Sequence, residues 1–223
     1  FLQIAYIVDA AKGETVRDKF APYFLFVTFF PHLIAGPLVH HRSLISQFSQ
    51  KMTNATENLS VGFTIFVIGL FKKLVLADIV VYWSDAVFNG AANGVAPSLV
   101  DSWVGAISFT LLIYFDFSSY SDMAIGLSKM LGIRLPENFN SPYKATSIIE
   151  FWRRWHITLS SFLRDYLYIP LGGNRKGQMR RHVNLMIVML LAGLWHGANW
   201  QFVLWGGLHG TYLLINHLWG SQK

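Results

Sequence analysis

The sequence predicts an all-α protein in which several helices cross or enter a membrane. Three observations carry this prediction. Hydrophobic residues make up 53% of the chain and charged residues only 13%, and the mean hydropathy is +0.38. Soluble domains carry about a quarter charged residues, so this composition is typical of a membrane protein. The third observation is a run from residue 182 to residue 222 that contains no Asp, Glu, Lys or Arg.

Apolar windows mark the expected helices. A helix needs about 20 apolar residues to cross about 30 Å of hydrocarbon. The stretch from Val183 to His196 is shorter than this, so we expect a half-span or a re-entrant helix there. The windows that could span or enter a bilayer are residues 20–41, 59–83 (apolar apart from Lys72, Lys73 and Asp78), 103–115 and 200–219.

Two polar connections separate these windows. Residues 89–98 (NGAANGVAPS) are rich in Gly, Asn and Pro and predict a turn, and residues 131–141 (LGIRLPENFNS) predict a second non-helical connection. The chain begins with Phe1 rather than Met, and its first residues resemble the end of a helix already under way. We therefore expect residues 1–223 to be the central part of a single membrane domain that lacks both of its ends.

One helix is expected to lie at the membrane interface. Ser147 and Glu150 fit the S/T-x-x-E pattern that opens a helix, and Pro170 ends it. Apolar residues from Phe151 to Tyr166 recur at spacings of three and four, as on one face of an α-helix. Aromatic and basic side chains on such a helix are typical of an interfacial segment, and a purely anchoring role is one interpretation of it.

The net charge of +6 is unevenly distributed. Short basic loops beside apolar spans tend to lie in the cytoplasm, so we expect the stretch Arg175–Arg181 to be cytoplasmic. We expect membrane topology and contact with anionic membrane lipids to account for most of the basic residues. A phosphate-bearing cytoplasmic substrate is the other interpretation, and we expect no nucleic-acid partner. The clustered basic residues are Arg153, Arg154, Arg164, Arg175, Lys176, Arg180 and Arg181.

Cysteine and histidine usage limits the chemistry. The chain contains no cysteine, which excludes a disulfide framework and a thiolate nucleophile. Its eight histidines show no HExxH or similar spacing, so we expect no metal site and no bound cofactor. His196 lies inside the uncharged run, where an ionisable side chain is costly and usually marks a functional position. A neutral core histidine bonded to a backbone carbonyl is the other interpretation.

Two carboxylates interrupt an apolar region. Asp116 and Asp122 flank Ser118, Ser119 and Ser121 in the segment FDFSSYSDMAIG. Carboxylates at membrane depth need a partner, which the serines, an arginine or the histidines could supply. Alternatively, the small hydroxyl residues pack one helix against another.

Several ordered blocks of the chain resemble the membrane-bound O-acyltransferase family. The likeness is nearest to its bacterial branch of alginate and other polysaccharide O-acetylation proteins, and the D-alanyl transfer proteins of teichoic acid synthesis are more distant. Ser119 stands where the family pattern has Gly. The blocks cover nearly the whole chain and read SPYKATSIIEFWRRWHITLSSFLRDYLYIPLGGNRKG, LLAGLWHGANWQFVLWGGLHG, FFPHLIAGPLVHH and FDFSSYSDMAIGLSKMLGIRLPENF.

The resemblance implies two catalytic histidines. His196, in LWHG, matches the family's invariant histidine, and His156, in RRWHITLS, matches a second position that holds His or Asn. A neutral imidazole suits the removal of a hydroxyl proton, and we expect His156 or Asn199 to donate to the developing oxyanion. The candidates for binding the substrate are Trp155, Arg153, Arg154, Asn199, Asp116 and Asp122.

The resemblance also implies an architecture and a reaction. It implies a ring of many helices around a central tunnel, in a protein that crosses a bacterial inner membrane several times. The donor would be a cytoplasmic acyl thioester such as acetyl-CoA. The acceptor would be an exported polysaccharide such as alginate, reached directly or through a periplasmic acetyltransferase partner. Transfer of D-alanine to teichoic acid is the related alternative.

Two further alternatives belong to other functional classes. His182, His196 and His209 are separated by 14 and 13 residues, a spacing that could place the axial ligands of a His-ligated membrane cytochrome along one helix. The glycines between His196 and His209 argue against one straight helix there. A transporter that relays protons through His and Asp is the other alternative, and it would need no acyl donor.

Overall fold

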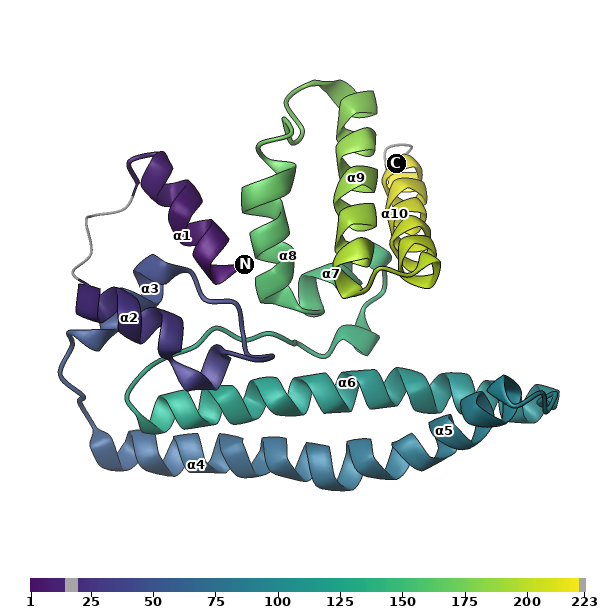
Figure 1. Cartoon of the computed structure of the whole chain (residues 1–223), viewed down its shortest axis with the longest axis horizontal. Coiled ribbons are helices and arrows are strands. Elements are labelled where there is room, and N and C mark those ends of the chain that lie inside the picture. Colours follow the sequence, from purple (N-terminus) through teal and green to yellow (C-terminus); the bar gives the residue numbers. More distant parts are fainter. Residues whose placement is uncertain (15–19, 221–223) are drawn as a thin grey trace. The chain divides into compact units, whose positions relative to one another are not determined.

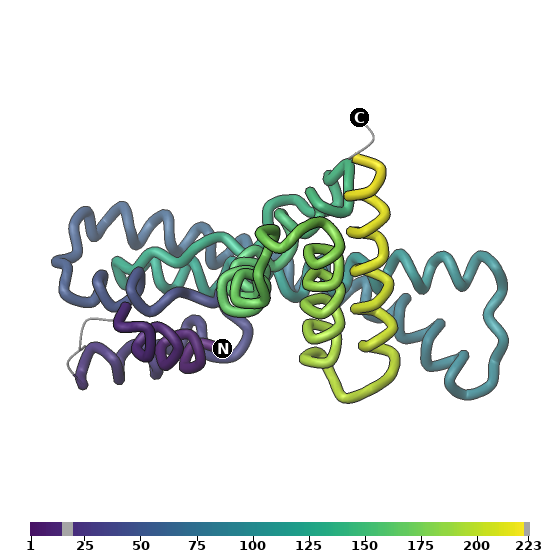
Figure 2. Tube along the Cα trace, turned by 90° about the horizontal axis from the view of Figure 1, so that it is seen from above, coloured from purple at the N-terminus to yellow at the C-terminus, as the bar shows by residue number. Residues whose placement is uncertain are grey.

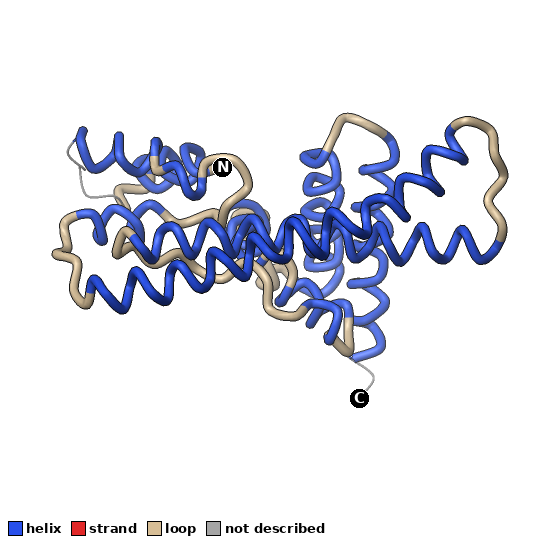
Figure 3. The backbone as a smooth tube through the Cα atoms, turned by 90° about the horizontal axis from the view of Figure 1, so that it is seen from below, coloured by secondary structure: helices blue, strands red, loops and turns tan. Residues whose placement is uncertain are grey.

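A computed structural model of the chain describes residues 1–14 and 20–220, and all of its regular elements in these residues are helical (Figures 1 and 3). The all-α prediction is therefore confirmed for this part of the chain. The helices form two compact units. The N-terminal unit comprises Tyr6–Glu137 with Leu2, and the C-terminal unit comprises the residues from Asn138 onward with Phe1 and Gln3–Ala5.

A long helical hairpin dominates the N-terminal unit. Its first arm is a continuous but bent rod made of α4, a π-helical turn η2 and α5, and its second arm is α6, which runs antiparallel beside the rod (Figure 1). The helical elements are α1 (Leu2–Ala11), α2 (Phe20–Thr28), η1 (Phe30–His32, 3₁₀), α3 (His41–Phe48), α4 (Ala55–Phe71), η2 (Lys72–Ala77), α5 (Asp78–Ala92) and α6 (Leu99–Met130).

Small residues allow the two arms of this hairpin to approach closely. A Cβ atom added at Gly126 would lie 2.6 Å from the carbonyl oxygen of Gly62, so neither position tolerates a side chain without a shift. Ser118, Ser119 and Ser121 are each at most 1% exposed. The Ser-rich segment thus packs helix against helix, as the second interpretation of it predicted. Gly69 faces the backbone of Ser119, which explains how the helices stay close although Ser replaces the family's Gly.

Helix α6 is the one helix in residues 1–14 and 20–220 that is long and apolar enough to cross a membrane. Its 32 residues rise roughly 48 Å at 1.5 Å per residue. The window at residues 20–41 is not one helix, because α2 ends at Thr28, and Pro31 and Pro37 interrupt the rest of the window. The turn expected at residues 89–98 is shorter than predicted, since α5 continues to Ala92.

The C-terminal unit is built on an antiparallel pair, α9 and α10, which lie side by side (Figure 2). Gly193 of α9 contacts the Phe202 carbonyl of α10 so closely that a Cβ atom would clash. Helix α9 starts within the basic segment and has 20 residues, but it is not among the helices apolar enough to cross a membrane, so the half-span at 183–196 stays a prediction. The elements are η3 (Pro142–Lys144, 3₁₀), α7 (Ile148–Arg154), α8 (Ile157–Leu163), η4 (Arg164–Tyr168, π), α9 (Gly177–His196) and α10 (Trp200–Gly220).

The single interfacial helix predicted from Ser147 to Pro170 is instead broken into α7 and α8. Trp155 is extended (φ −98°, ψ 128°), and His156 is left-handed (φ 41°, ψ 55°). The start at Ser147 is confirmed, because its hydroxyl accepts from the N–H of Glu150 at 3.1 Å. The break places His156 at a corner between two helices, a position that a continuous helix could not provide.

Candidate active site

His156 is held at this corner by a buried asparagine. Its Nδ1 lies 3.0 Å from the amide oxygen Oδ1 of Asn138, and the two residues are 5% and 1% exposed. The same oxygen accepts from the N–H of Thr158 at 3.3 Å and from its hydroxyl at 2.9 Å. The carbonyl oxygen of Asn138 also accepts from the N–H of Ile157 at 2.9 Å. Asn138 therefore fixes both the backbone and the imidazole of this corner.

These contacts define which nitrogen of His156 carries a proton. A backbone N–H only donates, so the atom of Asn138 that faces Thr158 is the amide oxygen and not the amide nitrogen. Nδ1 of His156 faces the same oxygen and must therefore donate to it. In the neutral ring, Nε2 is then the acceptor. His156 is arranged to accept a hydrogen bond or a proton through Nε2.

Burial keeps His156 uncharged. His156 lies outside α6, the candidate membrane span. Desolvation lowers the pKa of His156 to about 4, with a smaller contribution from repulsion by a charged His196. The ring is therefore neutral at pH 7. His156 and His196 both belong to the C-terminal unit, and of the two only His196 lines the cavity described below.

His196 is the last residue of α9 and lies among aromatic rings. Its ring centroid is 5.2 Å from that of Trp205, 4.8 Å from that of Trp195 and 6.2 Å from that of Phe202. The side chain is exposed, and it forms no hydrogen bond to another residue in the part of the chain that the structure describes. The interpretation of His196 as a core histidine bonded to a backbone carbonyl is therefore not supported.

A cavity of about 400 Å³ runs along His196 within the C-terminal unit. Its volume lies within the range of small-molecule sites, about 300–1,000 Å³. The wall is apolar along α8, α9 and α10, with Leu159, Val188 and Met189 among its residues. The polar residues that line it are Arg153, Ser160, Arg164, Tyr168, Asn174, Arg181, His196 and His217. An apolar group with a polar or anionic end fits this distribution.

The predicted substrate-binding residues of this unit have different surroundings. Arg153 lines the cavity, is exposed and forms no ion pair within residues 1–14 and 20–220. Arg154 instead donates to Glu150 Oε1 from Nη2 at 2.6 Å and from Nε at 3.1 Å. Trp155 packs against the ring of Phe151, with centroids 5.6 Å apart. Arg153 is thus the better placed of the two arginines to meet a ligand.

Glu150 is tied into the start of α7. Its carboxylate accepts from the N–H of Thr146 at 2.7 Å and from the Thr146 hydroxyl at 2.9 Å. These bonds, together with Arg154, lower the pKa of Glu150 to about 2. In the capping box that the sequence predicts, this carboxylate would bond to the N–H of Ser147, so the observed contact is one residue earlier.

Asn199 caps the start of α10 and is exposed. Its side-chain oxygen accepts from the N–H of Gln201 at 3.3 Å. It lies three residues beyond His196, in the short connection between α9 and α10. Its amide NH₂ group supplies a donor near that histidine in the sequence.

Asp116 and Asp122 belong to the N-terminal unit and pair with lysines. Lys73 Nζ lies 2.6 Å from Asp116 Oδ1, and Lys72 Nζ lies 2.6 Å from Asp122 Oδ2. The lysines come from η2, and a π-helical turn of this kind often marks a functional position. The sequence predicted serines, an arginine or histidines as partners, and the observed partners are lysines. These contacts hold the two arms of the hairpin in register.

Three residues of the C-terminal unit were not predicted as site residues. Asn138 carries no signal of its own, because it lies in a non-helical connection 18 residues before His156. The rings of Trp152 and His209 lie 5.3 Å apart. Trp152 Nε1 and His209 Nδ1 are both buried without a hydrogen-bond partner in the described part of the chain. His209 could have been found, because it lies in the GLHG segment of a block that resembles the family.

The positions of the histidines bear on two kinds of bound group, a haem and a metal ion. His196 ends α9 whereas His209 lies in α10, so they do not follow one another along one helix as the cytochrome alternative requires. Asp9, His40 and His41 place three possible ligand atoms within 4.8 Å of one another. However, Nδ1 of His40 accepts from the N–H of Arg42 at 3.3 Å, so Nε2 of the neutral ring donates to Asp9 at 2.9 Å. That tautomer has no Nε2 lone pair for a metal.

Comparison with known proteins adds to this geometry. The chain is 49% identical to a protein of Azotobacter vinelandii named "Probable alginate O-acetylase AlgI", over 96% of this chain and 42% of that protein. It is 50% identical to a Helicobacter pylori peptidoglycan O-acetyltransferase, over 96% of this chain and 45% of that protein. A Streptococcus thermophilus teichoic acid D-alanyltransferase is 28% identical over 100% of this chain and 56% of that protein.

The chain thus spans less than half the length of the two O-acetylation relatives. The sequence pattern of the membrane-bound O-acyltransferase family matches residues 10–222, which include both histidines, Asn138 and the residues that line the cavity. The relatives at about half identity match over nearly the whole chain. The chain belongs to the membrane-bound O-acyltransferase family.

Proposed function

We propose that this chain carries the catalytic centre of a membrane enzyme that moves an acyl group, in the first place acetyl, from a thioester to hydroxyl groups of a polysaccharide. The names of the relatives at 49% and 50% identity support O-acetylation over D-alanyl transfer, whose named relative is only 28% identical. The observations that carry the mechanism are the position of His196 in the wall of a cavity and, in the same unit, a neutral His156 whose tautomer is fixed by Asn138.

His196 is the proton acceptor in this proposal, because it lines the cavity where substrates can reach it. It removes the proton of the acceptor hydroxyl while the oxygen attacks the thioester carbonyl carbon. The carbon–sulfur bond then breaks, and the protonated His196 returns the proton to the leaving thiolate. General-base catalysis of this kind contributes about 10²–10⁴-fold to a rate. Apolar walls would limit hydrolysis of the thioester by water.

His156 stabilises the charge that forms on His196. Its Nδ1 donates to Asn138, so its Nε2 can accept but cannot donate in the neutral ring. The sequence-based expectation that His156 donates to the oxyanion therefore gives way to a role as acceptor. Asn199, with an amide NH₂ group, is the remaining candidate for the oxyanion donor. Arg153 supplies an unpaired cation for an anionic part of the donor or acceptor.

The remaining features of the proposal follow from the family. We propose a multi-pass protein of a bacterial inner membrane, with helices arranged around a tunnel that joins a cytoplasmic donor such as acetyl-CoA to an exported polysaccharide such as alginate. A periplasmic acetyltransferase completes the transfer in this scheme. The enzyme needs no bound cofactor, because the thioester itself is the activated group.

The full-length protein in proteoliposomes tests this proposal. Radiolabelled acetyl-CoA is supplied on one side, and the label on alginate oligosaccharides or released acetate is measured. We expect a His196-dependent loss of acetyl-CoA, with the label on a glycan when the partner protein is present. Activity only with a D-alanyl thioester would favour the teichoic acid alternative, and transport of a solute without any acyl donor would favour a transporter.

A further inference from the structure

A second cavity, of about 420 Å³, lies in the N-terminal unit. It forms where the segment between α3 and α4 meets the end of α6. Its lining is polar and contains three cationic side chains, Lys51, Lys129 and Arg134, and one carboxylate, Glu57. The proposed reaction uses none of these residues.

The charge of this cavity is unbalanced. Lys51, Lys129 and Arg134 form no ion pair within residues 1–14 and 20–220. The carboxylate of Glu57 is 3.3 Å from the amide nitrogen of Asn54 and does not pair with any of the three cations. The cavity therefore has two more positive charges than negative ones, and its cations have hydrogen-bond donors available for an anion.

The cavity wall is held in place before any ligand binds. The Gln47 amide oxygen accepts from the N–H of Arg134 at 2.8 Å, and the Gln47 amide nitrogen donates to the carbonyl of Arg134 at 3.1 Å. The amide nitrogen of Asn58 donates to the carbonyl of Thr53 at 2.8 Å. The two bonds of Gln47 join α3 to the segment that follows α6, 87 residues away. The backbone that carries Arg134 is therefore fixed by contacts within the protein.

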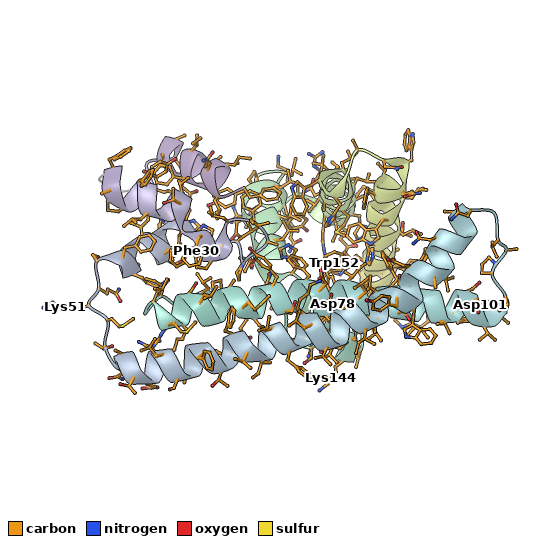
Figure 4. All side chains as sticks on the ribbon, turned by 60° about the horizontal axis from the view of Figure 1, so that its bottom comes forward. Phe30, Lys51, Asp78, Asp101, Lys144 and Trp152 are labelled. Carbon is orange, nitrogen blue, oxygen red and sulfur yellow. The ribbon has the colours of Figure 1, made fainter. Side chains whose placement is uncertain are left out.

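The cavity lies at the basic end of the candidate membrane span. Figure 4 shows Lys51 at one end of the helical hairpin and Asp101 at the opposite end. Lys129 lies in the last turn of α6, whereas residues 84–101 at the other end contain Asp85 and Asp101 and no Lys or Arg. Basic residues beside a span favour the cytoplasmic side, whose leaflet is rich in anionic lipids.

Exposed apolar side chains adjoin the cationic lining. Met52 and Leu131 are 44% and 51% exposed, and Leu59 and Phe63 on the first turns of α4 are 52% and 60% exposed. A ligand with an anionic head and hydrocarbon chains matches both features. We propose that this cavity binds the phosphate head group of an anionic membrane lipid, with the lipid chains along α4.

Native mass spectrometry of the full-length protein tests this proposal. The protein is released from nanodiscs that contain phosphatidylglycerol or phosphatidylcholine, and retained lipid is counted. We expect retention of phosphatidylglycerol and little retention of phosphatidylcholine. The triple variant Lys51→Gln, Lys129→Gln, Arg134→Gln should bind phosphatidylglycerol at least about tenfold more weakly, because each cation near an anionic surface contributes to binding. Glu57→Gln, which removes the one carboxylate, should bind it more tightly.

A charge-matched control separates this site from general attraction. Lys12→Gln, Arg42→Gln, Lys144→Gln removes three exposed cations that lie outside both the cavity and the basic stretch Arg175–Arg181. An equal loss of lipid in this control would overturn the proposal. Inorganic phosphate is titrated as a second probe. Binding of phosphate to the cavity without retention of phosphatidylglycerol would show a site for free phosphate and would also overturn it. Acyl transfer by His196 is measured separately, so failure of the lipid site leaves the proposed function intact.

Discussion

Asn138 Oδ1 and His156 Nδ1 lie 3.0 Å apart in the interior of the C-terminal unit. Because the same oxygen accepts from the N–H of Thr158, the orientation of the amide is defined by the backbone. The asparagine therefore decides the tautomer of a histidine that the family resemblance places in catalysis. A histidine whose tautomer is fixed by a further side chain is a recurring arrangement in acyl-transfer enzymes.

Replacing Asn138 should impair acyl transfer through His156. Loss of a buried hydrogen bond costs about 1–3 kcal/mol, so Asn138→Ala should lower kcat/KM by roughly 5- to 150-fold. Asn138→Asp should retain more activity, but its carboxylate favours the charged imidazole and raises the pKa of His156. The acid limb of the pH–rate profile should then move to higher pH. An unchanged profile in Asn138→Asp with lower protein yield would indicate a purely structural role.

His196→Ala should abolish acyl transfer while the full-length protein still inserts into the membrane. The side chain is exposed beside the cavity, so its removal creates no buried hole and stability should change little. Glycan acylation and membrane expression measured in parallel check this. Retention of more than about a tenth of the acylation would contradict a general-base role, whose expected contribution is larger.

His156→Asn should keep part of the activity that His156→Ala loses. Asparagine retains an acceptor and a donor, although it has no titratable proton, and the family resemblance implies His or Asn at this position. His196→Asn should be nearly inactive, because an amide does not take up a proton. All three variants are compared in one acylation assay. If His156→Asn were as inactive as His156→Ala while His196→Asn remained active, His156 would be the proton acceptor and His196 the supporting residue.

The low pKa of His156 should make folding sensitive to acid. The pKa is about 4 in the folded protein against an ordinary value of 6.5. Between these values the unfolded chain binds a proton that the folded chain does not, so the free energy of unfolding falls as the pH decreases. Thermal unfolding in detergent should show a lower Tm at pH 5 than at pH 7.5, with a smaller difference in His156→Asn. His32, whose pKa burial also lowers to about 4, titrates in both proteins, so the comparison isolates His156.

The sequence predicted the helical class, which the structure confirms, and two catalytic histidines, whose role stays a prediction, but it did not predict the backbone conformation that presents His156. Apolar residues continue at helical spacing through Trp155, so the periodicity contains no sign of the break at that residue. The left-handed backbone of His156 is stabilised by contacts with Asn138, 18 residues away. A local pattern does not include a tertiary contact of this kind.

The partners of Asp116 and Asp122 show a second limit. Their need for a partner could be predicted from their apolar surroundings. The identity of the partners depends on the register between α6 and the rod that contains η2, which places Lys72 and Lys73 opposite them. Register between antiparallel helices is decided by packing of small residues such as Gly62 and Gly126, and the sequence alone does not show which glycines meet.

The side of the membrane on which α9 begins remains a prediction that labelling can test. Four of the seven residues in Arg175–Arg181 are Lys or Arg, and they precede an apolar helix, which favours the cytoplasm. Gln178 is exposed near the start of α9, and the chain has no native cysteine to compete for label. In the full-length protein, with any other cysteines replaced, Gln178→Cys should resist a membrane-impermeant maleimide in intact cells and react after lysis. Lys51→Cys, at the basic end of α6, should behave in the same way. Ready labelling of Gln178→Cys from outside would place the start of α9 on the periplasmic side and reverse the side from which the donor is expected to enter.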